Sequence, residues 1–130
     1  MKKFNLSEIM KNAWNLFRST GNLFSECLHQ AWAMAKMMTI GNLWQKYGKS
    51  RVYFNQNALL DLCGVEISYY NTGNVSGCIV NGTWESNADG RRWLSSTDGV
   101  YYDIDRKAFF GPRGTFTQDV FDALHRFLKF

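Results

Sequence analysis

Cysteine and histidine are the residues of this chain best suited to nucleophilic catalysis, because a histidine can deprotonate a neighbouring thiol. The sequence holds three cysteines and two histidines, namely Cys27, Cys63, Cys78, His29 and His125. They are scattered along the chain, and the cysteines lack the spacing of a zinc site or of a disulfide framework. We therefore interpret the cysteines as reduced core thiols and predict no catalytic thiol.

Carboxylates offer no stronger case for an enzyme. Glu26 and His29 have the spacing of half a carboxylate-bridged di-metal motif, but no second Glu-x-x-His follows on another predicted helix. Asp103 and Asp105 flank a predicted hairpin turn, where aspartate serves the turn itself. No glycine-rich loop ends in the Lys-Ser/Thr of a phosphate-binding motif. The sequence predicts a protein that is not an enzyme, with no catalytic residues, no metal and no cofactor.

Aromatic and arginine pairs give a better signal for binding. Tyr69 and Tyr70 precede a polar turn, and Arg91 and Arg92 follow within the next elements. Exposed rings can stack on bases while arginines contact phosphates. One tyrosine of a half-buried strand can equally point into the core. We predict these four residues as a partner-binding group and leave that structural alternative open.

Positive charge is concentrated at the front of the chain. The net charge is +4, but residues 1–51 contain eight basic and two acidic residues, a balance of +6. Such an imbalance favours an acidic partner, either nucleic acid or an acidic protein face, although a solvated helix surface is the alternative. The predicted basic front comprises Lys2, Lys3, Lys11, Arg18, Lys36, Lys46, Lys49 and Arg51.

The secondary structure that would position these candidate residues begins with a repeated segment. The segment Ser7-Glu8-Ile9-Met10-Lys11-Asn12-Ala13-Trp14 returns as Ser25-Glu26-Cys27-Leu28-His29-Gln30-Ala31-Trp32. Helical spacing of apolar residues predicts two helices that form an antiparallel hairpin, each presenting alanine and tryptophan to a shared seam. The first inner stripe is predicted as Leu6, Ile9, Met10, Ala13, Trp14 and Phe17.

Short strands follow the helices. Segments 51–54, 65–69, 77–80, 83–85, 100–103 and 107–110 have strand-like composition, with short helices at 57–63 and 91–96 and a closing helix from Thr117. The fold class is therefore α+β: an N-terminal antiparallel helical hairpin, then a small, mostly antiparallel sheet with short helices and a C-terminal helix. We predict a hairpin at 1–40, a joint at 41–50 and an α+β body at 51–130.

Two groups of segments carry a family resemblance. Leu6-Ser7-Glu8-Ile9-Met10, Ala13-Trp14 and residues 24–28 and 31–36 resemble a leader found on small phage and mobile-element proteins of Firmicutes. Residues 70–76, Ser86-Asn87 and residues 100–103 are similar to the body of such proteins. Several proteins of that gene neighbourhood are anti-CRISPR or other anti-defence factors, generally non-enzymatic blockers of a host nuclease. The resemblance implies that class and transfers no functional residue.

The sequence thus leads to two hypotheses. The first is a non-enzymatic anti-defence protein that occludes a host CRISPR nuclease such as Cas9. Many such blockers are acidic mimics of DNA. Because this chain is basic, it would instead bind an acidic protein face or nucleic acid. The alternative is a nucleic-acid-binding accessory protein of a phage or mobile element. We expect a cytoplasmic location in an infected bacterium, no membrane partner, and a possible homodimer through the helical hairpin.

Overall fold

The computed structural model describes residues 4–129 and begins with two helices, α1 (Leu6–Thr20) and α2 (Phe24–Ile40). Asn5 caps α1, since its Oδ1 accepts a hydrogen bond from the backbone N–H of Glu8 at 3.1 Å. Gly21 ends the helix with a φ of 70°, a left-handed conformation that glycine adopts readily. The two helices pack against each other, which confirms the predicted hairpin.

The repeated segments bury their alanines but not their tryptophans, of which Trp32 is half-buried and Trp14 exposed. Ala13 and Ala31 lie in the seam between α1 and α2. The predicted inner position of Trp14 is wrong, because its side chain is 45% exposed. Successive helical residues are rotated by about 100°, so a helix that centres Ala13 on the seam turns Trp14 toward the edge. There Trp14 packs on Phe24, with ring centres 4.4 Å apart.

Large apolar side chains consequently remain exposed along α1. Of the predicted inner stripe, only Ile9 and Ala13 are buried. Its other members form an exposed row, called here the α1 stripe, which consists of Leu6, Met10, Trp14 and Phe17. Contiguous exposed apolar surface is a common feature of contact sites in proteins.

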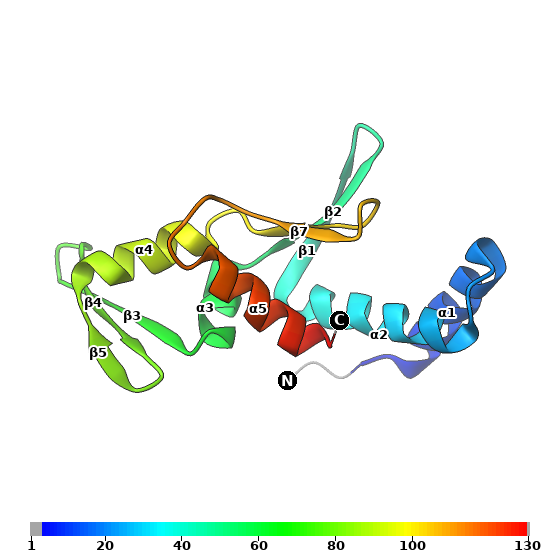
Figure 1. The fold of residues 1–130 in the computed structure, drawn as a ribbon, viewed down its shortest axis with the longest axis horizontal. Helices are drawn as coiled ribbons and strands as arrows, with labels where there is room; N and C mark the ends of the chain where they lie inside the picture. The colour runs from blue at the N-terminus through cyan, green and yellow to red at the C-terminus, as the bar shows by residue number, and fades with distance from the viewer. Residues whose placement is uncertain (1–3, 130) are drawn as a thin grey trace.

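Helix α2 belongs to two hydrophobic cores. Its first half packs on α1 around the buried Cys27. Its second half places Met37 in the main core of the protein, together with Val52 and Leu59. One continuous helix therefore fixes the hairpin to the rest of the molecule, and Figure 1 shows α1 at one end of an elongated shape.

Four antiparallel strands form the central sheet, in the order β1-β2-β6-β7. The segment predicted as a joint, 41–50, forms the first strand, a two-residue turn and the start of the second. Gly48, with a φ of 71°, allows that turn. The strands are Gly41–Lys46 (β1), Lys49–Phe54 (β2), Tyr101–Asp103 (β6) and Ala108–Phe110 (β7).

A second antiparallel sheet lies at the other end, so the strands divide into two sheets where we expected one. Its order is β3-β4-β5, and helix α4 crosses it at Gly90. Glycine is needed there because a Cβ at position 90 would lie only 2.7 Å from Val75 Cγ1. The elements are α3 (Gln56–Leu62), β3 (Val65–Tyr69), β4 (Val75–Val80), β5 (Thr83–Glu85) and α4 (Asn87–Thr97).

The C-terminal helix α5 (Thr117–Leu128) closes the main core. It buries Val120, Leu124 and Leu128. Figure 1 shows α5 between the two sheets and beside α2. The predicted α+β class is confirmed, and among the described residues no helix has the length and apolar character needed to cross a bilayer.

Candidate nucleic-acid interface

The central sheet has one face in the core and one face carrying aromatic and basic side chains. Val52, Phe54 and Tyr102 are buried on the inner face, which is covered by α2 and α5. Because side chains alternate along a strand, Arg51 and Tyr53 point the other way. These outer residues are only half-buried.

A row of aromatic rings runs across this outer face, with one ring from each strand. Trp44 of β1 contacts Tyr53 of β2 with ring centres 6.0 Å apart. Tyr53 contacts Tyr101 of β6 at 5.1 Å, and Tyr101 stacks on Phe110 of β7 at 5.5 Å. The antiparallel register aligns these residues, since Tyr53 is paired with Tyr101 and Tyr101 with Phe110. We call these four rings and Arg51 the aromatic face.

Arg51 is held within the row by its neighbours. Its guanidinium carbon lies 4.5 Å from the Tyr101 ring centre and 5.5 Å from that of Trp44, which are cation–π distances. Its Nη1 donates a hydrogen bond to the hydroxyl oxygen of Tyr53 at 3.0 Å, and this bond raises the pKa of Arg51. The buried Nε has no hydrogen-bond partner among the described residues. Leaving this buried donor unpaired costs free energy.

Further cations border the aromatic face at one end of the sheet, where the β1–β2 and β6–β7 turns lie side by side. Lys46 and Lys49 are exposed and face each other across the β1–β2 turn. Arg106 lies over the Phe110 ring at 5.8 Å and 4.0 Å from a carboxylate oxygen of Asp103. Positive charge therefore lies at one end of the row of rings, and the buried carboxylate residue Asp103 is paired with Arg51 in the strand register within it.

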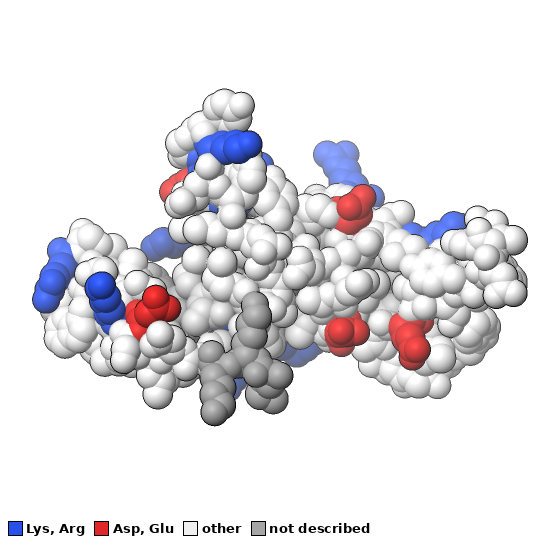
Figure 2. All heavy atoms as spheres, turned by 180° about the vertical axis from the view of Figure 1, so that it is seen from behind, with Lys and Arg blue, Asp and Glu red and all other residues white. Residues whose placement is uncertain are grey.

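The predicted basic front does not form one surface. Lys46, Lys49 and Arg51 come together on the β1–β2 hairpin, whereas Lys11 and Arg18 lie on α1. The remaining members are Lys36, half-buried on α2, and Lys2 and Lys3, which lie outside the described residues. Figure 2 shows basic side chains spread along the molecule, with acidic side chains between them.

The second predicted group comes from two elements, β3 and α4, that belong to the same end of the molecule and pack on β4. Tyr69 and Tyr70 are exposed at the end of β3. Arg91 and Arg92 are exposed on α4, where they border a shallow hollow of about 410 Å³ with Arg113. Arg92 is bound to Asp89 by an ion pair of 2.6 Å. Tyr69 is paired with Val75, on which α4 packs at Gly90, so the tyrosines and arginines stay candidates on neighbouring elements.

The three cysteines do not lie in an environment that activates a thiol. Cys27 and Cys78 are buried, and burial raises the pKa of Cys78. Burial, with a smaller effect of nearby Asp119, raises the pKa of Cys63 to about 11, so its thiol is protonated near neutral pH. Within residues 4–129, no three His, Cys, Asp or Glu side chains gather as metal ligands.

Sequence reasoning missed most of the aromatic face. Only Arg51 was among the predicted binding residues, and it was chosen for its charge. The alternation of Arg51, Val52, Tyr53 and Phe54 was a usable signal, because it separates an inner apolar pair from an outer polar-aromatic pair. That signal could not show which strands lie beside β2.

Comparison with known proteins gives no further lead, because no protein-family model, no curated protein and no solved structure matches this chain.

Proposed function

We propose that this protein binds single-stranded nucleic acid through the aromatic face. The observation that supports the proposal is the row of four rings across the central sheet with Arg51 held inside it. Aromatic rings bind unpaired bases by stacking, worth about 1–3 kcal/mol per base. Lys46 and Lys49 extend the same surface with charges suited to the sugar–phosphate backbone.

Single strands suit this surface better than a duplex does. The rings of the aromatic face lie along a sheet and are half-buried, so a base must leave its own stack to reach them. Unpaired bases are free to do this, whereas paired bases are not. A net charge of +4 adds non-specific attraction for either form.

Fluorescence anisotropy with labelled single strands and a matched duplex tests the proposal. We expect binding of the single strand at low salt, weakened roughly tenfold by Trp44→Ala or Tyr53→Ala, because each removes a stacking ring. Trp84→Ala is the matched control for Trp44→Ala, since its ring is exposed on the other sheet. No binding at low salt, or equal weakening by the control variant, would contradict the proposal; circular dichroism verifies that each variant is folded.

Inhibition of a CRISPR nuclease such as Cas9 is a second candidate function. The α1 stripe favours it, because exposed apolar surface is suited to contact with a protein. A nuclease bound to its guide offers both a protein surface and RNA, which fits a protein with both kinds of surface. On this proposal the protein acts in the cytoplasm of an infected bacterium.

A cleavage assay tests whether the protein inhibits a CRISPR nuclease. We expect purified protein to slow target cleavage, and we expect Met10→Ser combined with Trp14→Ser to relieve the inhibition, since both changes remove apolar contact area from the α1 stripe. Unchanged cleavage by several effector nucleases would exclude the second candidate, while leaving binding of single strands by the aromatic face to its own test.

A further inference from the structure

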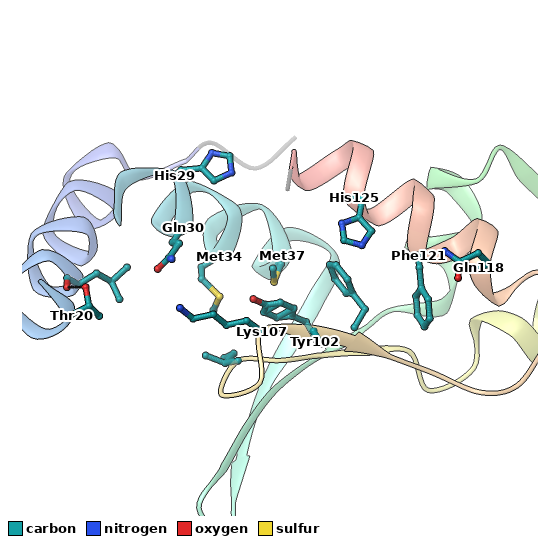
Figure 3. A pocket seen from close by; sticks show the side chains of 14 residues that line it. Thr20, His29, Gln30, Met34, Met37, Tyr102, Lys107, Gln118, Phe121 and His125 are labelled. Atoms are coloured by element: carbon teal, nitrogen blue, oxygen red, sulfur yellow. Dashed lines mark hydrogen bonds between the residues drawn. The ribbon is translucent and has the colours of Figure 1, made fainter. Parts of the chain in front are cut away.

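A groove of about 720 Å³ opens on the core side of the central sheet, between α2, the β6–β7 hairpin and α5. Its walls are apolar, with Met34 and Met37 from α2, Phe109 from β7 and Phe121 from α5. Figure 3 shows Met34, Met37 and Phe121 around the same space. Apolar walls and a volume of several hundred Å³ are typical of sites for small molecules.

The charge at this groove is positive. Lys107, at the β6–β7 turn, borders it, and none of its described lining residues is acidic. Lys107 takes part in neither of the two ion pairs found among residues 4–129. Figure 3 shows its side chain extending into the groove beneath Met34. The groove therefore complements an anion.

Local structure holds Lys107 in place. Its φ is 54°, a left-handed conformation that is uncommon for a residue with a side chain. The turn that imposes it is fixed at two points: the backbone N–H of Arg106 donates to Asp103 Oδ1 at 3.0 Å, and the backbone N–H of Ser50 donates to Asp105 Oδ2 at 3.3 Å. The turn thus fixes the backbone of Lys107 beside the groove.

We propose that this groove binds a small amphipathic carboxylate, with its apolar body between the methionine and phenylalanine walls and its carboxylate at Lys107. The site is distinct from the aromatic face. Consecutive tyrosines of β6 serve the two sides of the sheet, since Tyr101 lies in the aromatic row while Tyr102 lines the groove. The proposal therefore does not depend on nucleic-acid binding.

Decanoate and its uncharged methyl ester, both kept below the concentration at which they aggregate, are suitable probes. Calorimetry measures affinity, and NMR of the full-length chain with ¹³C-labelled methionine methyl groups locates the ligand. We expect shifts at Met34 and Met37 and none at Met10, which lies in the α1 stripe. Absence of binding, or shifts confined to Met10, would overturn the proposal.

Two variants test the assigned roles. Lys107→Met should weaken decanoate about tenfold and leave the methyl ester unchanged, because only the carboxylate uses the amine. Met34→Asn should weaken both probes, since it makes one wall polar. Lys49→Met is the matched control, because it removes an exposed lysine that does not line the groove. Equal weakening of both probes by Lys107→Met, or weakening of decanoate by Lys49→Met, would show that Lys107 does not bind the carboxylate.

Discussion

The guanidinium carbon of Arg51 lies 4.5 Å from the centre of the Tyr101 ring, although the two residues belong to strands β2 and β6 with much of the chain between them. The β2–β6 register produces this contact by pairing Arg51 with Asp103 and Tyr53 with Tyr101. A cation held over a ring, with further rings to either side, forms a surface for stacking and charge at once. This contact is central to the proposed binding of single strands.

Salt dependence tests which basic residues meet the phosphates. For single strands, each phosphate contact contributes about 0.7 to the slope of log affinity against log salt. Lys46→Gln combined with Lys49→Gln should therefore reduce the slope by about 1.4, measured by anisotropy over a salt series. Lys11→Gln combined with Arg18→Gln removes two charges from α1 and should leave the slope unchanged. The opposite result would favour the helical part of the predicted basic front.

Unfolding experiments test the exposed position of Trp14. Trp14→Ala should lower the free energy of unfolding by only about 1 kcal/mol, because the residue is 45% exposed and mainly loses its ring contact with Phe24. Met37→Ala should cost about 2–5 kcal/mol, because Met37 is fully buried in the main core. Urea titration compares the two variants. Similar losses for both would mean that Trp14 is buried in solution, as a helical-hairpin dimer requires.

The Gly90→Ala variant tests whether helix propensity or packing has the larger effect on stability at this position. In an open helix the change would stabilise the protein by about 0.5–1 kcal/mol. Here the new methyl group would lie 2.7 Å from Val75 Cγ1 and 3.2 Å from the Gly77 carbonyl oxygen, and overpacking of this kind costs about 1–3 kcal/mol. We expect a net loss of about 1 kcal/mol by urea denaturation. Adding Val75→Ala should reduce that loss, whereas a stabilised Gly90→Ala variant would disprove the close approach of α4 to β4.

The raised pKa of Cys63 predicts that the stability of the protein depends on pH in the alkaline range. Burial raises the pKa of its thiol to about 11, whereas the unfolded chain releases this proton nearer pH 9. Between these values the folded state binds more protons, so this contribution to stability is complete below pH 9 and is lost as the pH rises toward 11. The difference in unfolding free energy between the wild type and Cys63→Ala should therefore shrink over that range. A constant difference would contradict the raised pKa.

Local pattern alone determined much of this fold. The hairpin helices, the C-terminal helix and the β6–β7 hairpin all follow from apolar spacing, capping and turn residues, since such signals act over a few neighbouring positions. Asn5 and Gly21, for example, fix the two ends of α1 from within the chain. The sequence alone likewise shows that no residues have the spacing of a recognisable catalytic motif.

Tertiary structure decided which of those residues share a surface. Sheet register brings Trp44, Tyr53, Tyr101 and Phe110 into one row, and periodicity within a strand says nothing about its neighbours. The same limit applies to Trp14. Its helical spacing placed it beside the seam, but the close approach of two helices at Ala13 and Ala31 determines which apolar residues are enclosed and which stay in water.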